Sequence, residues 1–467
     1  MNNNDKEMTS HSIAIKNLKK IAILSTFGGL LFGVDTGVVN GALSFMAKPK
    51  ELNLSSNDEG LVTSSITLGA AIGAVISGKL SDKFGRRKVL LYLSFIFLTF
   101  TLLSSLAPNA FSIICFRFLL GLAVGGASVI VPTFLSELST PSMRGRLVTQ
   151  NELMITGGQL MAYIVNALLG TLFGNQSNIW RWMLAFGMIP ALGLLIGMLI
   201  VPESPRWMVM KGKIDKAKST LQLIRTNNEE VKNEINQIQD TIRAEKMTKK
   251  AGFKDLKTPW IRKLVLIATG IGIVQQIIGI NIMMYYGTNI LMKSGFGHQA
   301  ALIANIGNGL VSTLFTYVGM KLMNKVNRRK MILTGITGTT ISLFIISIVS
   351  KFLVDSSLLP YLVIITTMVF LGFFQGCISP ITWLLMSEIF PQNIRGLGMG
   401  ISTFFLWISN FGVGFLFPIL LSKIGLSMTF LVFVICNIFS FAFIRKFAPE
   451  TRGKSLEQIQ LEFKNNK

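Results

Sequence analysis

Long apolar runs separated by short polar stretches occupy the chain from Ile21 to Phe447. About twelve of them reach roughly twenty residues, the length at which a helix crosses a hydrocarbon core about 30 Å thick. The pattern therefore predicts an all-α membrane protein. Its twelve expected helices lie near residues 21–43, 60–80, 89–107, 111–135, 150–172, 182–201, 262–290, 300–323, 331–352, 360–386, 397–421 and 425–445.

Composition supports this prediction, because half of the 467 residues are hydrophobic and only 14% are charged. A soluble domain does not tolerate these proportions. The first run is too long for the apolar part of a secretory signal and contains Asp35, so we expect it to be kept as a helix. Cys115, Cys377 and Cys436 all fall inside predicted helices, which argues against a disulfide framework or a zinc site. We expect no metal and no cofactor.

The net charge of +23 comes from basic residues concentrated in alternate connections between the apolar runs. This is the positive-inside pattern of membrane proteins, so nucleic-acid binding is not needed to explain it. The pattern predicts a multi-pass protein of the cell membrane with both termini in the cytoplasm. The basic segments are Lys16–Lys20, Lys83–Lys88, Arg144–Arg146, 203–262, Asn327–Lys330 and Arg445–Lys454.

Three local patterns recur at a separation close to 250 residues and indicate an internal repeat. The pairs are Gly78–Arg87 with Asn324–Arg329, Ser136–Arg144 with Ser387–Arg395, and Pro202–Trp207 with Pro449–Gly453. Duplicated bundles of this kind are typical of membrane transporters. We expect two pseudo-symmetric six-helix bundles over 1–202 and 261–447, a connection of amphipathic cytoplasmic helices over 203–260, and a cytoplasmic tail over 448–467.

Five motifs together resemble the sugar porter family of the major facilitator superfamily over residues 19–460. They are Gly28–Gly37, Asp82–Arg87, Pro202–Trp207, Gln275–Asn281 and Pro449–Gly453. The resemblance implies the major facilitator fold and import of a sugar or cyclitol by alternating access. No nucleophile–base pair, metal-ligand cluster or phosphate-binding loop indicates an enzyme. We expect the monomer to be the functional unit.

Asp35 and Arg117 lie inside predicted helices, where a charge costs about 2.5–3.5 kcal/mol on insertion scales and needs a partner. One interpretation is a structural ion pair between two helices. The other is a switch that opens when the carboxylate takes a proton. Sugar porters that act as proton symporters resemble this chain in having an aspartate here, which favours the switch. Since His11 and His298 lie in a tail and a loop, a carboxylate must relay any proton.

The seventh run carries four polar groups suited to a neutral, hydroxyl-rich solute: Gln275, Gln276, Asn281 and Tyr285. On a straight helix three of them share an arc of roughly 120°, but Gln276 points about 100° away from Gln275. All four can face one cavity only if the helix bends, and Gly279 permits a bend. Alternatively, these groups form hydrogen bonds between helices.

The resemblance adds further solute-binding residues, namely Glu152, Gln159, Trp383 and Asn410, with Ser312 as an additional candidate. Many hexose and pentose porters have glutamine in place of Glu152, and bacterial xylose symporters have glutamine in place of Leu406. Over 59–65, 148–155 and 406–410, the chain is most similar to bacterial myo-inositol transporters. A carboxylate at Glu152 could accept two hydroxyl hydrogen bonds from a cyclitol or pair with a basic neighbour.

Charged residues at the cytoplasmic helix ends are predicted to form a gate that closes that side. They are Asp82, Arg86, Arg87, Glu137, Arg144, Glu388 and Arg395. We expect Glu137 to pair with Arg144, and Glu388 to pair with Arg395 in the same way. Asn324 and Asn327 replace an aspartate and a glycine of the motif, so the second copy should be weaker. In the alternative interpretation, these charges only set the topology.

Three other activities fit the same residues. A hexose–proton or pentose–proton symporter would differ only in its solute. A facilitative uniporter would use the Asp35–Arg117 pair as structure alone. A nutrient receptor that binds without transport usually needs a long cytoplasmic tail, and only about twenty residues follow Phe447.

Overall fold

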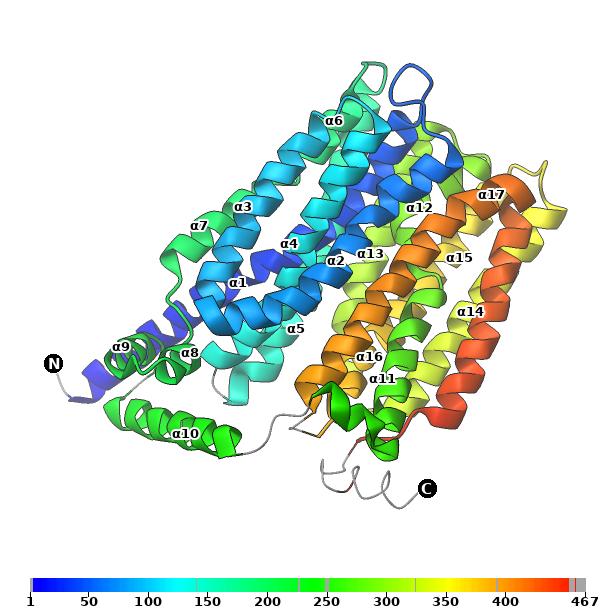
Figure 1. The fold of residues 1–467 in the computed structure, drawn as a ribbon. Helices are drawn as coiled ribbons and strands as arrows, with labels where there is room; N and C mark the ends of the chain where they lie inside the picture. The colour runs from blue at the N-terminus through cyan, green and yellow to red at the C-terminus, as the bar shows by residue number, and fades with distance from the viewer. Residues whose placement is uncertain are drawn as a thin grey trace.

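The computed structural model describes residues 3–139, 141–225, 227–247, 252–323, 325–391, 394–452 and 458, without the side chains of residues 3–15, 19, 141–149, 244–247 and 253. Every regular element within these ranges is a helix. Figure 1 shows two groups of long helices side by side, one coloured blue to teal and the other green to red. The predicted all-α class with two bundles is confirmed.

The first bundle contains α1 (Asn3–Met46), α2 (Ser56–Phe84), α3 (Arg86–Ser105), α4 (Ala110–Leu138), α5 (Pro141–Phe173), α6 (Ile179–Ala185) and α7 (Met188–Ile200). The sixth predicted span is thus two helices, interrupted at Phe186 and Gly187. Helix α1 begins well before the predicted residue 21, so His11 lies within a helix and not in a tail.

Between the bundles the chain forms three short helices, α8 (Pro205–Met210), α9 (Ile214–Ile224) and α10 (Asn228–Met247), which we call the connector. Figure 1 places the connector at the same end of the bundles as the start of α1 and the end of α17 (Arg395–Phe447). The buried Arg225 side chain fixes it there, donating to Glu234 at 2.6 and 2.7 Å and to the Leu138 carbonyl at the end of α4 at 3.1 Å. We refer to this end as the connector side.

The second bundle follows a 3₁₀ turn, η1 (Phe253–Lys257). It contains α11 (Pro259–Ile277), α12 (Ile280–Lys293), α13 (His298–Leu322), α14 (Arg328–Phe352), α15 (Leu359–Phe373), the π-helical turn η2 (Phe374–Ile378), α16 (Ser379–Ile389) and α17 (Arg395–Phe447). His298 is the first residue of α13, and not a loop residue as expected.

Eleven helical stretches of the described residues are long and apolar enough to cross a membrane. The last of them, α17, has 53 residues and would be about 80 Å long if straight, far more than one bilayer needs. Its backbone leaves the helical region at Gly425, where φ is 74°. Figure 1 shows the orange limb turning there into an antiparallel red limb. The eleven stretches therefore contain twelve crossings.

Glycines let the helices of the first bundle approach closely. A Cβ atom added at Gly33 of α1 would lie 1.9 Å from the Ile155 carbonyl oxygen of α5, and one at Gly69 of α2 would lie 2.0 Å from the Phe118 carbonyl oxygen of α4. These helix pairs therefore pack backbone against backbone, as small residues permit in lipid. Gly33, Gly37 and Gly41 of α1 all face α5, which leaves Asp35 on another side of the helix.

Gly69 and Gly78 of α2 offer a matched test of this packing, because an added Cβ at Gly78 would meet nothing within 4 Å. We expect Gly69→Ala to destabilise the protein by about 1–3 kcal/mol through overpacking. Gly78→Ala should be neutral or stabilising by up to about 1 kcal/mol, since alanine favours helix. Thermal unfolding of the purified variants in detergent measures the difference. Equal Tm values would contradict the close backbone contact.

Candidate functional site

The seventh span is broken where the sequence predicted a bend. Helix α11 ends at Ile277, Gly279 has a φ of 103°, and α12 begins at Ile280. This backbone conformation suits glycine and few other residues. The bend at Gly279 is therefore confirmed.

Three amide side chains form a hydrogen-bonded chain across this break. Asn281 Nδ2 donates to Gln276 Oε1 at 2.5 Å, and Gln276 Nε2 donates to Gln275 Oε1 at 3.5 Å. Two of the three residues precede the break and one follows it. The geometry of the break thus sets the spacing of these amides.

Several buried polar atoms from both bundles make no hydrogen bond to any described residue. They include Gln159 Oε1 of α5, Tyr285 Oη of α12, Ser312 Oγ of α13, and Trp407 Nε1 and Asn410 Oδ1 of α17. A buried polar group without a partner costs about 1–3 kcal/mol. All five are neutral, so a ligand rich in hydroxyl groups could supply the missing partners.

Helices α5 and α13 bring two of these groups near the same level. A Cβ atom added at Gly309 of α13 would lie 3.0 Å from Leu160 Cα of α5. Because the two helices run antiparallel, Ser312, three residues further along α13, lies within one helical turn of Gln159 along the helix axes. Glu152 lies two turns before Gln159 on the same stripe of α5, since seven residues return to within about 20°.

An aromatic contact also joins the bundles. The rings of Phe32 in α1 and Trp407 in α17 are 5.6 Å apart at 83°, an edge-to-face arrangement. Sequence reasoning missed both residues. Trp383, which it proposed, lies half-buried on α16. No interaction among the described residues joins Trp383 or Glu152 to the amides at the break.

Asp35 and Arg117 form the expected buried ion pair. The guanidinium donates to both carboxylate oxygens, at 3.2 and 3.3 Å, and its Nε donates to the Val62 carbonyl at 2.6 Å. The pair joins α1 to α4. Tyr285 of the second bundle is near enough to interact electrostatically with both charges and faces Asn410. The ion pair therefore borders the group of unpartnered polar atoms.

Buried polar contacts also join the bundles on the side opposite the connector. Asn40 Oδ1 of α1 accepts from the Thr288 amide at 3.0 Å and hydroxyl at 2.7 Å, and Asn40 Nδ2 donates to the Met284 carbonyl at 2.6 Å. Asn305 Nδ2 of α13 donates to the Thr288 hydroxyl at 3.0 Å. We call Asn40, Thr288 and Asn305 the latch.

A second contact lies next to the latch. Ser44 of α1 forms a hydrogen bond of 2.8 Å with His298 Nε2, and the Phe45 ring packs against the same imidazole at 4.2 Å between centroids. Sequence reasoning missed the latch and this contact. Polar residues within predicted helices of both halves, or next to their ends, were the signal that could have indicated them.

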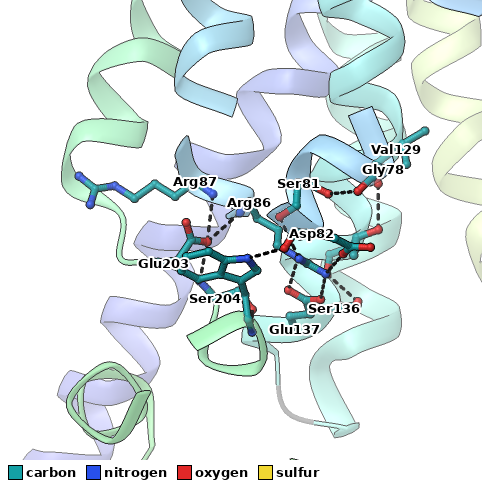
Figure 2. A network of polar contacts seen from close by, with 12 residues as sticks. Gly78, Ser81, Asp82, Arg86, Arg87, Val129, Ser136, Glu137, Glu203 and Ser204 are labelled. Carbon is teal, nitrogen blue, oxygen red and sulfur yellow. Dashed lines mark hydrogen bonds and ion pairs between the residues drawn. The ribbon is translucent and has the colours of Figure 1, made fainter. Parts of the chain in front are cut away.

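On the connector side, charged groups form a network within the first bundle (Figure 2). Arg86 contacts Asp82 at 3.0 Å and Glu137 at 3.0 Å, and it donates to the Ser81 carbonyl at 3.1 Å. Arg87 turns to α7, donating to the Met198 carbonyl at 2.7 Å. The network therefore links the ends of α2, α4 and α7.

The contacts of Glu203 give a reason why the motif that contains it is repeated. Its carboxylate accepts from the backbone amides of Arg86 and Arg87 at 2.9 and 3.1 Å, at the start of α3, where the helix dipole favours an anion. Gly85 makes room for it, since an added Cβ would lie 2.2 Å from Glu203 Oε2. In the second bundle Glu450 caps the start of α14 in the same way, at 3.0 and 3.1 Å from two backbone amides.

The expected pairing of the gate residues differs from the observed one. Glu137 pairs with Arg86, and the side chain of Arg144 lies outside the described residues. Glu388 contacts Arg328 at 3.6 Å, a longer distance than in the first copy. Arg395 donates to the Phe390 carbonyl at 3.3 Å. The sequence spacing did not reveal that each glutamate meets the arginine at the start of α3 or α14. Asn324 lies outside the described residues.

Comparisons with known proteins agree with this architecture. The family described as sugar (and other) transporter matches residues 21–463. The major myo-inositol transporter IolT of Bacillus subtilis (strain 168) is 53% identical over 447 residues, which cover 96% of this chain and 94% of IolT. The putative metabolite transport protein YncC of the same organism is 53% identical over 450 residues, which cover 96% and 95%.

Solved structures show the same fold. The xylose transporter XylE from E. coli, in a partially occluded inward open conformation, aligns with a TM-score of 0.82 at 26% identity, covering 94% of this chain and 100% of XylE. A second XylE structure, described as that of a proton:xylose symporter, aligns with a TM-score of 0.78 at 27% identity, covering 96% and 99%.

The family match spans nearly the whole chain and includes all five motifs that carried the resemblance. Two bundles of membrane-spanning helices and the shared fold with XylE agree with it. Proteins of this family are transporters, not enzymes. The chain belongs to the sugar (and other) transporter family, the sugar porters of the major facilitator superfamily.

Proposed function

We propose that this sugar porter imports myo-inositol, or a sugar of similar hydroxyl pattern, together with a proton by alternating access. The set of buried, neutral, unpartnered atoms contributed by both bundles carries the proposal. A neutral polyhydroxylated solute satisfies such a set, whereas a charged solute would need a compensating charge. We assign solute contacts to Glu152, Gln159, Gln275, Gln276, Asn281, Tyr285, Trp383 and Asn410.

The preference for a cyclitol rests on the identity to IolT and on Glu152. Glu152 occupies the stripe of α5 that also carries Gln159, and a carboxylate there can accept hydrogen bonds from two adjacent hydroxyls. A ring that carries a hydroxyl on every carbon offers such pairs in any orientation.

Proton coupling is assigned to Asp35 and Arg117. Protonation of Asp35 would remove the negative charge that holds Arg117 and weaken the pair, while the arginine keeps its hydrogen bond to the Val62 carbonyl. Tyr285, close to this pair and facing Asn410, provides a route by which the change reaches the solute site. A membrane potential of 100 mV supplies about 2.3 kcal/mol per proton, enough to accumulate solute. The likeness to the proton:xylose symporter XylE supports this assignment.

Alternating access is assigned to the two ends of the molecule. The positive-inside pattern of the basic connections supports a cytoplasmic position for the connector side and for both termini of this cell-membrane protein. The latch then closes the outer side in this structure. The residues proposed for the inner gate are Asp82, Arg86, Arg87, Glu137, Arg144, Glu388 and Arg395. We propose that one copy of the chain performs the whole cycle.

Uptake into membrane vesicles tests the proposal. Labelled myo-inositol, D-xylose and D-glucose are supplied to vesicles with a proton gradient, with and without an uncoupler. We expect myo-inositol to accumulate and the uncoupler to reduce its accumulation at least tenfold. Asp35→Asn should show the same loss without the uncoupler, because an amide cannot exchange a proton. Asp215→Asn, at an exposed carboxylate of α9, is the control and should behave as wild type.

Other outcomes separate the alternatives. Preferential uptake of D-xylose or D-glucose would replace the cyclitol by a pentose or hexose. Solute equilibration that is unaffected by the uncoupler and by Asp35→Asn would make the protein a uniporter. Binding without uptake would make it a receptor.

The gate assignment generates a separate prediction. Glu137→Gln weakens the contact with Arg86, so closure of the connector side should become less favourable and the inward-open state more populated. We expect solute affinity within twofold of wild type and a maximal transport rate at least fivefold lower. Glu229→Gln, on the exposed surface of α10, should change neither. Wild-type transport by both Glu137→Gln and Arg144→Gln would refute the gate.

A further inference from the structure

Asn437, on the second limb of α17, is fully buried beside the break in the seventh span. Its Nδ2 donates to the Ile278 carbonyl at 3.1 Å and to the Phe433 carbonyl of its own helix at 2.8 Å. Its Oδ1 accepts from the Thr339 hydroxyl of α14 at 3.0 Å. One side chain thus connects three helices, and one of its partners lies in the break itself.

The Ile278 carbonyl needs this partner. In an unbroken α-helix it would accept from the amide of Ile282, four residues later. Here the Ile282 amide donates to the Gly279 carbonyl instead, at 3.2 Å. A backbone carbonyl left without a partner at membrane depth costs several kcal/mol, so broken helices persist there only where other groups replace the lost bond. The Asn437 amide is such a group.

The break determines where the solute-facing amides lie. Gln275 and Gln276 stand before the break and bond to each other, and Asn281 stands after it and bonds to Gln276 across it. If the Ile278 carbonyl recovered the Ile282 amide, the helix would straighten. Asn281 would then point about 140° away from Gln276, five residues earlier, and the hydrogen bond between these two amides would be lost.

We propose that Asn437 is a positioning residue for solute recognition, which holds the break of the seventh span open without touching the solute. Thr339 orients the Asn437 amide by donating to its oxygen. This proposal rests on the proposed function, because it assumes that the amides at the break bind the solute.

The same helix pair provides a matched control. Ser347 of α14 donates to the Ser427 carbonyl of α17 at 2.8 Å, and Ser427 donates back to the Ser347 carbonyl at 2.7 Å. These bonds stay between α14 and α17. Ser347→Ala therefore weakens the packing of the same two helices without removing a partner of the break.

The first readout is solute affinity, measured by intrinsic tryptophan fluorescence of the purified full-length protein with myo-inositol, D-xylose and D-glucose. We expect Asn437→Leu, similar in volume but without a donor, to weaken binding of the preferred solute at least tenfold. Ser347→Ala should stay within twofold. Because Asn437 acts through the amides, Asn437→Leu should add little to the loss caused by Asn281→Ala. Additive losses, or equal losses in Ser347→Ala, would overturn the proposal.

The second readout does not depend on the solute. The rate of hydrogen–deuterium exchange at the backbone amides of residues 276–284 should change at least threefold in Asn437→Leu and remain unchanged in Ser347→Ala. Unchanged exchange in Asn437→Leu would show that the break does not need this amide. Should Asn437→Leu fail to fold, Thr339→Val keeps the amide, removes the group that orients it, and should change both readouts in the same direction. A third outcome separates the two proposals. If Asn437→Leu alters exchange but the wild-type protein binds none of the three solutes, the proposed function is rejected and Asn437 remains the group that holds the break.

Discussion

A backbone in lipid has no water to bind, so every amide and carbonyl within the membrane must find a partner in the protein. Most of this chain meets the requirement with long helices. Where a helix ends or breaks, a side chain takes over: Asn437 serves the carbonyl of Ile278, and Glu203 and Glu450 serve the first amides of α3 and α14. The break at Ile278 and the start of α3 are also the places to which the proposed solute site and inner gate belong.

The same structure combines two kinds of helix contact. Inside the first bundle, Gly33 and Gly69 bring backbones together so tightly that no methyl group fits, which makes the bundle a rigid unit. Across the bundles, the latch joins the helices through hydrogen bonds of side chains. Each such bond contributes only about 0.5–1.5 kcal/mol net, so a few of them can break and re-form during a transport cycle. Rigid halves joined by weak contacts are what rocking of one bundle against the other requires.

Much of the fold could be predicted from the sequence because it depends on local properties: run length gives the spans, the repeat gives the two bundles, and a glycine at position 279 permits the bend. The pairing of Arg86 with Glu137 could not be predicted, because spacing along the chain does not say which helix ends meet. Trp407 and Asn437 were missed for a related reason. Each looks like an ordinary residue of an apolar helix until the neighbouring helix is placed against it.

Helix α1 is unbroken over 44 residues, about 66 Å at the ordinary helical rise. Along this one rod lie a hydrogen bond from Asn17 to the Leu223 carbonyl of the connector at 3.1 Å, the ion pair of Asp35, and the latch residue Asn40. Rotation or sliding of α1 would be felt at all three points together. A bulky reporter or affinity tag fused ahead of Asn3 would be attached to this rod, so a fusion behind α17 is the safer choice for following the protein in cells.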